Sequence, residues 1–178
     1  MALFAGKLLP FKRPLDLIDA AALMRERGIE LEVLVAGDGE LRSEMAKRAE
    51  DAGVTMHLLG FCNQSEMPAV YAAADCLVLP SDGRETWGMV VNEALACGRP
   101  VIVSDACGCA PDLALDGTAG RQFPMADIEA LSRSLVAILR APPAQCSITA
   151  ISDRYSLTGA SQGVIAALAS ISERCSAI

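Results

Sequence analysis

Short apolar runs that alternate with helix-like segments constrain the fold of this 178-residue chain more than any other feature. Each run is short enough to be a buried strand, and a longer segment with helical periodicity follows it. The expected strands are Ala2 to Ala5, Leu31 to Ala36, Val54 to Leu59, Cys76 to Leu79 and Val101 to Val103. Strands that alternate with helices are typical of βαβ units around a parallel sheet. We therefore predict an α/β fold with a Rossmann-like parallel sheet flanked by helices.

The segments between these runs carry start and stop signals of helices. Gly28 and Gly53 are expected to end the first two helices, and Ser65 and Ser156 are expected to cap the third and the last. The polar, proline-bearing stretch Ala141 to Ser147 is the expected linker. The predicted helices are Pro14 to Arg27, Glu40 to Ala52, Glu66 to Ala74, Met89 to Cys97, Asp127 to Leu139, Ile148 to Arg154 and an amphipathic helix from Leu157 to about Ile171.

Length and composition favour one globular domain. With 52% hydrophobic residues the chain can bury a sizeable core, expected over about 2–140, with the C-terminal helices at about 148–171. A net charge of −7 and few aromatic residues argue against a nucleic-acid partner. No apolar run reaches the roughly 18 residues that cross a membrane, and no signal peptide precedes the first strand. We expect a soluble, cytoplasmic protein without a membrane span.

The seven cysteines are odd in number and scattered. Cys107 and Cys109 form one close pair, but a single intervening residue is not the spacing of a zinc site. We expect reduced thiols, as in a cytoplasmic protein, with no metal site.

The stretch from Leu79 to Asp105 holds the strongest functional signal. Glu85 stands at a loop-to-helix junction and Glu93 follows eight positions later, beside a helix N-terminus near Gly88 and Met89. Carboxylates accept hydrogen bonds from sugar hydroxyls, and free N–H groups at a helix start bind phosphate oxygens. This pattern suits a sugar attached to a phosphate. The alternative is that Glu85 only stabilises the helix start and that Glu93 is a solvated helix position.

Basic residues gather in the first loop after a strand. Of the three lysines in the chain, Lys7 and Lys12 lie in this loop, and Arg13 follows directly before a helix. Point charges and a helix N-terminus both favour anions, so this loop is a candidate diphosphate clamp. The alternative is a solvated basic loop.

Several motifs together resemble a known enzyme family. Pro80-Ser81, Glu85-Thr86-Trp87-Gly88, Glu93 to Gly98 and Pro100-Val101 resemble the signature of the retaining glycosyltransferases of family 4 (group 1), which have the GT-B fold. The resemblance runs from about residue 5 to 168 and maps onto the C-terminal, donor-binding half of that fold. It implies binding of a UDP-, GDP- or ADP-sugar, retention of configuration, and chemistry without a metal or another cofactor. It also implies that the N-terminal acceptor domain is absent and that the chain alone is nearly inactive.

The resemblance assigns roles residue by residue. Lys12 and Lys7 are implied to neutralise the leaving diphosphate, with Lys7 where the family usually has arginine. Glu85 is implied to orient the donor sugar, and Glu93 to accept hydrogen bonds from the ribose diol. The implied catalytic residues are Glu85, Lys12 and Lys7, and the implied donor-binding residues are Glu93, Gly88, Trp87, Met89, Phe61, Cys62 and Gly6.

Two other functions fit the same residues. The chain could be a non-catalytic nucleotide-sugar-binding subunit that completes its cleft with an acceptor-domain protein or with a second copy of itself, through an apolar face of the helix from Leu157 to Ile171. A nucleotide-sugar 2-epimerase-like domain is the other alternative, because it uses a similar donor cleft.

Overall fold

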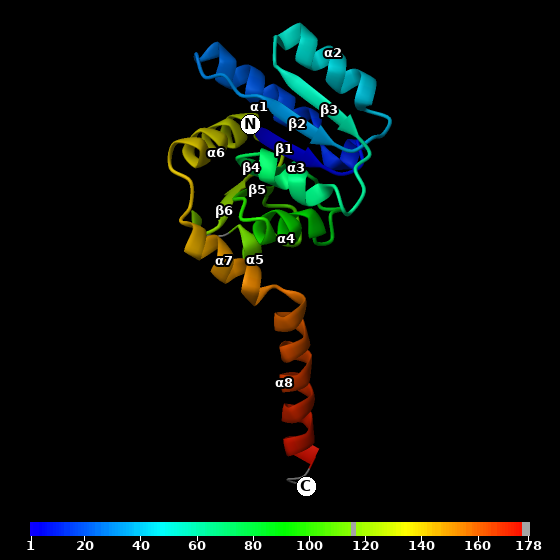
Figure 1. Ribbon diagram of the computed structural model, residues 1–178, viewed down its shortest axis with the longest axis vertical. Helices are drawn as coiled ribbons and strands as arrows, with labels where there is room; N and C mark the ends of the chain where they lie inside the picture. The colour runs from blue at the N-terminus through cyan, green and yellow to red at the C-terminus, as the bar shows by residue number, and fades with distance from the viewer. Residues whose placement is uncertain (115–116, 176–178) are drawn as a thin grey trace.

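A six-stranded parallel sheet forms the centre of the computed structural model, which describes residues 1–114 and 117–175. The strands lie in the order β3-β2-β1-β4-β5-β6 (Figure 1). Their bounds are β1 Ala2–Ala5, β2 Val33–Ala36, β3 Met56–Gly60, β4 Cys76–Leu79, β5 Val101–Ser104 and β6 Gly120–Phe123. The predicted Rossmann-like parallel sheet is thereby confirmed.

The sheet has one strand more than the sequence predicts. β6 pairs with β5 in parallel, from Gly120 opposite Val101 to Phe123 opposite Ser104. Its residues Gly-Arg-Gln-Phe form no apolar run, because β6 is an edge strand with only its two ends buried. The other five strands lie where they are expected, except that β2 and β3 each begin two residues later than predicted and β3 and β5 each end one residue later.

Helices cover both faces of the sheet. Residues of α1, α2 and α6 form one buried cluster with the sheet, and residues of α3, α4, α5 and α7 form the other. The bounds are α1 Leu15–Glu26, α2 Arg42–Ala52, α3 Met67–Ala73, α4 Met89–Ala96, α5 Ala110–Leu113, α6 Ile128–Arg140, α7 Gln145–Arg154 and α8 Leu157–Cys175, with a 3-10 turn η1 at Pro10–Lys12. This arrangement has the three layers that a parallel sheet needs to bury both of its faces.

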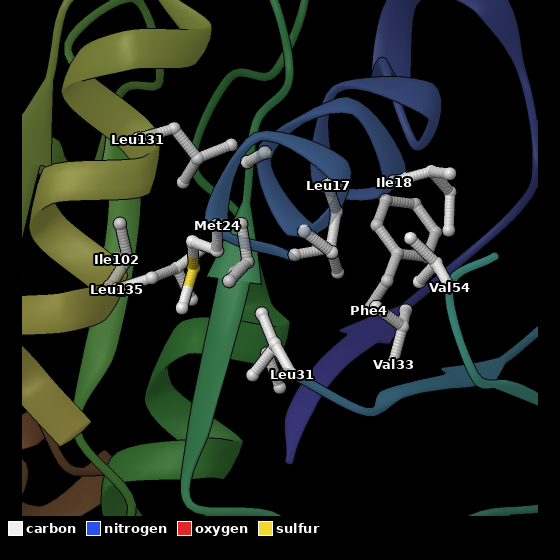
Figure 2. Packing of buried hydrophobic residues seen from close by; sticks show 14 of the residues in the cluster. Phe4, Leu17, Ile18, Met24, Leu31, Val33, Val54, Ile102, Leu131 and Leu135 are labelled. Carbon is white, nitrogen blue, oxygen red and sulfur yellow. The ribbon is translucent and has the colours of Figure 1, made fainter. Parts of the chain in front are cut away.

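Figure 2 shows the packing on the α1 and α6 side. Met24 of α1 lies near Leu131 and Leu135 of α6, above Ile102 of β5, and all four side chains are almost fully buried. Burying an aliphatic side chain of this size contributes about 1.5–3 kcal/mol. α6 follows β6 in the sequence and packs on α1, so this layer of helices joins an early and a late part of the chain.

Some predicted helix boundaries are wrong. α7 begins at Gln145, so it takes up the last part of the predicted linker. Ser65 is not the cap of α3, because the Asn63 side chain accepts the hydrogen bonds of the Ser65 and Glu66 N–H groups instead. Ser156 does cap α8, with the Gly159 N–H donating to its hydroxyl at 3.1 Å. The helical turns α5 and η1 were not expected.

The last helix projects from the sheet domain. α8 extends away from the other elements in Figure 1, and its main contact is with α7. Large apolar side chains on it remain exposed, with 61% of Val164, 65% of Ile165 and 63% of Leu168 accessible to solvent. In the described part of the chain, no helix is both long and apolar enough to cross a bilayer.

The strand order fixes where a ligand fits. β1 has β2 on one side and β4 on the other, so the crossover after β1 runs to one side of the sheet and that after β4 to the other. The loops at the carboxyl ends of β1 and β4 therefore diverge and leave a crevice between them.

Candidate functional site

A cleft of about 440 Å³ lies at this point of the sheet. Its lining comes from the loops after β1, β2 and β3 and from α3 and α4. The lining residues are Ala5, Gly6, Lys7, Ala36, Gly37, Asp38, Phe61, Cys62, Met67, Val90 and Glu93. The expected site residues Gly6, Lys7, Phe61, Cys62 and Glu93 thus share one cleft, although they come from three separate segments of the sequence.

Backbone hydrogen bonds fix the floor of this cleft. The Gly6 N–H donates to the Ala36 carbonyl at 2.9 Å, and the Gly37 N–H donates to the Gly60 carbonyl at 2.7 Å. These bonds tie the ends of β1, β2 and β3 to one another. Gly37 has a φ of +149°, and a Cβ built on it would lie 1.8 Å from the Gly6 carbonyl oxygen. The two loops can approach this closely only because residue 37 is glycine.

Lys12 and Glu85 form an ion pair on the neighbouring loops. The Lys12 ammonium donates to the Glu85 carboxylate, and both side chains are largely buried. The Ser81 hydroxyl donates to the same oxygen of Glu85 at 3.2 Å, and the Asp82 N–H joins the two loops by donating to the Phe11 carbonyl. Among the described residues, Lys12 and Glu85 are not part of the cleft lining, but they follow β1 and β4, as Lys7 and Glu93 do. The four expected charged residues therefore lie on the same two crossovers.

Glu93 is held by a residue that the sequence did not point to. Tyr71 of α3 donates its hydroxyl to Oε2 of Glu93 at 2.6 Å. Burial, and then this hydrogen bond, raises the pKa of Tyr71 well above its usual value. The phenol is therefore a hydrogen-bond donor at any physiological pH. Tyr71 lies in an apolar helix pattern, so periodicity indicates only a core position for it.

The start of α4 has a left-handed backbone conformation at its N-cap. Gly88 is the N-cap, with a φ of +100° in the left-handed region, and Met89 begins the helix with 60% of its surface exposed. A helix start presents N–H groups without intrahelical acceptors. Gly88 and Met89 are therefore placed at a helix terminus, as the sequence predicts.

Trp87 is not among the residues that line the cleft. Its indole N–H donates to Asn92 Oδ1 at 2.8 Å, and its ring lies 6.2 Å from that of Tyr155 at the end of α7. Asn92 in turn donates to the Tyr155 carbonyl at 3.2 Å. The side chain of Trp87 thus connects the loop before α4 to the junction of α7 and α8, and only its backbone adjoins Gly88.

Arg13 is not a free cation beside the two lysines. Its guanidinium forms two hydrogen bonds with the Asp16 carboxylate, at 2.8 and 3.0 Å. Burial raises the pKa of Asp16, while the pairing with Arg13 acts in the opposite direction. By contrast, within residues 1–114 and 117–175 no acidic partner of Lys7 is found, and its side chain is exposed at the cleft. Of the three basic residues in the loop after β1, Lys7 is thus the one that is available to an anion.

The loop after β3 forms one rim of the cleft. Phe61 is 82% exposed, and Cys62 is half-buried with its thiol 3.8 Å from the Gly60 carbonyl. Asp38 stands on the adjacent loop, where it accepts from the Gly39 N–H and from Arg42. An exposed aromatic ring next to backbone carbonyls can accommodate a flat, polar group such as a nucleobase.

The free thiols in the structure include Cys62, Cys76, Cys97, Cys107, Cys109 and Cys146. Burial raises the pKa of Cys107 and of Cys109 to about 12, although they adjoin the Glu85 and Gly88 loop. No group of three or more potential metal-ligating side chains occurs among the described residues.

These burial differences predict an order of reactivity. At pH 8 about one in 10⁴ thiols with a pKa near 12 is ionised. Of these four cysteines, iodoacetamide should therefore modify exposed Cys146 fastest, half-buried Cys62 more slowly, and Cys107 and Cys109 hardly at all. Peptide mass spectrometry at timed intervals measures this order. Modification of Cys107 as fast as that of Cys146 would contradict the burial described here.

Known proteins resemble this chain in sequence. The family described as glycosyl transferases group 1 matches residues 1–151. The D-inositol 3-phosphate glycosyltransferase of Arthrobacter sp. (strain FB24) is 36% identical over 126 residues, which cover 66% of this chain and 29% of that protein. The GDP-mannose-dependent alpha-(1-6)-phosphatidylinositol monomannoside mannosyltransferase of Mycolicibacterium smegmatis is 30% identical over 158 residues, which cover 84% of this chain and 41% of that protein.

A solved structure shares the fold. The structure of Anabaena Alr3699/HepE in complex with UDP superposes with a TM-score of 0.81 at 23% identity, over 95% of this chain and 48% of that one. The chain thus spans less than half the length of each of these three proteins. Its sheet corresponds to one Rossmann-like half of a GT-B fold. Since the family match extends over residues 1–151, the chain belongs to the glycosyl transferases group 1 family.

Proposed function

We propose that this chain is the donor-binding half of a retaining glycosyltransferase and that its cleft binds a nucleotide-diphospho-sugar. The observation that carries the proposal is that Lys7 and Glu93, an available cation and a carboxylate, line one cleft at the reversal of strand order. A cation next to a hydrogen-bond acceptor suits a diphosphate joined to a ribose diol.

The charged residues have complementary roles in this proposal. Lys12 and Lys7 neutralise the charge that develops on the leaving diphosphate, a type of stabilisation worth several kcal/mol. Glu85 accepts a hydrogen bond from a donor-sugar hydroxyl, and the Gly88 N–H binds the sugar or the phosphate. Two lysines can supply this charge without a metal ion, so the proposed reaction is metal-independent.

The proposed reaction retains configuration at the sugar. The bond from the anomeric carbon to the diphosphate oxygen breaks, and the acceptor oxygen forms its bond on the same face. The leaving phosphate takes the proton of the acceptor hydroxyl. No protein base is then needed at this step, and the acceptor is bound by a separate domain. Since the chain covers 29% and 41% of the two relatives, we expect it to be nearly inactive alone.

The comparisons suggest which donors to test. The Anabaena protein was solved with UDP and with UDP-glucose, and the Mycolicibacterium relative is named as GDP-mannose-dependent. UDP-glucose and GDP-mannose are accordingly the first candidates, with ADP-glucose as the third. The free thiols of these six cysteines support the proposal that the protein works in the cytoplasm, where thiols stay reduced.

A thermal-shift titration of the three nucleotide sugars tests this function. One of them should raise the melting temperature by mass action, and Glu93→Ala should weaken that binding about 10-fold because a hydrogen bond to a charged group is lost. Glu50→Ala is the matched control, since Glu50 is also an exposed helical glutamate but lies on α2. If no donor shifts the melting temperature, or if Glu93→Ala binds like Glu50→Ala, the proposal is wrong.

One observation favours a second candidate, a non-catalytic nucleotide-sugar-binding partner subunit. Leu157 at the start of α8 is 87% exposed, and Val164, Ile165 and Leu168 are also exposed, so α8 presents apolar surface that a partner could cover. Transferase activity of the chain combined with an acceptor domain would favour the enzyme, and donor binding without transfer in that complex would favour the subunit.

A further inference from the structure

Tyr71 and Glu93 join two helices behind the cleft. Tyr71 lies on α3 with only 2% of its surface exposed, and it belongs to the buried cluster on that side of the sheet. Glu93 lies on α4, is exposed and lines the cleft. The 2.6 Å hydrogen bond between them therefore connects a fixed core residue to a residue of the ligand site.

A buried phenol gives its hydroxyl a fixed position. The tyrosine side chain has two main torsions, and packing on both sides of the ring holds them in one rotamer. An exposed glutamate by contrast has three torsions and loses considerable freedom when it is ordered. The hydrogen bond from Tyr71 thus selects one of the rotamers that Glu93 could otherwise adopt.

The hydrogen bond leaves the carboxylate able to bind a ligand. Tyr71 donates to Oε2, and an ionised carboxylate has two oxygens with about four acceptor positions. Across the described ranges 1–114 and 117–175, no cation forms an ion pair with Glu93, so Oε1 and the remaining positions on Oε2 are available to two hydroxyl donors. Vicinal hydroxyls are such a pair of donors.

We infer that Tyr71 is a positioning residue that orders Glu93 in advance for the ribose diol of the donor nucleotide. This inference rests on the proposed function, in which Glu93 receives that diol. Tyr71 itself does not touch the ligand. Its contribution is that the carboxylate is already ordered when the nucleotide arrives, so less conformational entropy is lost on binding.

The test compares ribose and dideoxyribose nucleotides. Isothermal titration of the whole chain with UDP, GDP and their 2′,3′-dideoxy analogues gives the ratio of affinities for ribose over dideoxyribose. In the Tyr71→Phe variant this ratio should fall about 3- to 10-fold, because one hydrogen bond to a charged group is removed. Affinity for the dideoxy analogue should stay within about twofold, because this analogue has no diol to bind Glu93.

Tyr155→Phe is the matched control. Tyr155 is the other tyrosine of the chain and donates its hydroxyl to Asp112 at 2.8 Å, on the α7 side. This substitution also deletes a phenol-to-carboxylate hydrogen bond, but the ribose preference should not change. A loss of preference in both variants would point to a general effect on packing and would overturn the inference.

A double variant separates positioning from packing. Tyr71→Phe in a Glu93→Ala background should change the affinity for UDP or GDP by less than about twofold, because no carboxylate remains to be positioned. If the wild type prefers ribose and Tyr71→Phe keeps that preference, the inference alone is wrong. If the wild type binds neither diphosphate, or shows no ribose preference, the proposed role of Glu93 fails and the inference fails with it.

Discussion

Alanine at position 37 should lower the free energy of unfolding by at least about 3 kcal/mol, the largest stability effect that we expect from a single methyl group in this protein. The new Cβ would lie 1.8 Å from the Gly6 carbonyl oxygen and 2.8 Å from its carbon. Neither contact can be relieved by rotating a side chain, because both atoms belong to the backbone. The loops after β1 and β2 would have to separate, and the Gly37 N–H would then move away from the Gly60 carbonyl.

Gly6→Ala provides the control for this prediction. Gly6 has a nearly identical φ of +143°, but a Cβ there meets no atom within 4 Å. Its substitution should cost only the backbone strain, about 1–2 kcal/mol. Urea denaturation of both variants, followed by circular dichroism, measures the difference. Equal losses in the two variants would mean that strain, and not the close approach of the loops, determines the result.

Lys12→Met should have the largest effect on binding. Methionine keeps much of the apolar stem and removes the charge, so affinity for the preferred nucleotide sugar should fall about 10- to 100-fold. Lys47→Met is the matched control, since Lys47 is the third lysine of the chain and lies on α2. Calorimetric titration of both variants tests the prediction. An equal loss of affinity in the two would show that the effect comes from net charge and not from the loop.

The ion pair predicts that Lys12→Met also affects stability. Glu85, 12% exposed, would be left without its cation, which should lower the free energy of unfolding by about 1–3 kcal/mol. Adding Glu85→Gln removes the unpaired charge and should restore most of that stability without restoring donor binding. A double variant that recovers both properties would contradict the role of Lys12 at the diphosphate.

Strands were predictable where both faces are buried. β1, β4 and β5 are apolar at nearly every position, as parallel strands covered by helices are expected to be. β6 was not predicted, because its middle residues, Arg121 and Gln122, are polar and lie at the sheet edge. Its place in the sheet comes from pairing with β5, which is a tertiary contact and leaves no periodic signal in four residues.

The candidate site was predictable to the level of its motif residues. Charge and position relative to strand ends brought out Lys7, Lys12, Glu85 and Glu93, and the parallel topology then placed all four on the crossovers after β1 and β4. The hydroxyl donors that hold the two carboxylates, Ser81 and Tyr71, were missed as functional residues. Tyr71 meets Glu93 across two helices, and Ser81 meets Glu85 through the irregular fold of one loop. A periodic sequence pattern encodes neither contact.

The central place of β1 bears on how the polypeptide acquires its shape during synthesis. β1 is made before the other five strands, yet one of its two neighbours, β4, starts only at Cys76. The ribosome must therefore release more than seventy residues after β1 begins before that edge of β1 can pair. Such long-range pairing is slow, and an unpaired apolar edge can associate with other nascent chains in the meantime. Chaperones that shield such edges are therefore expected to raise the yield of this protein.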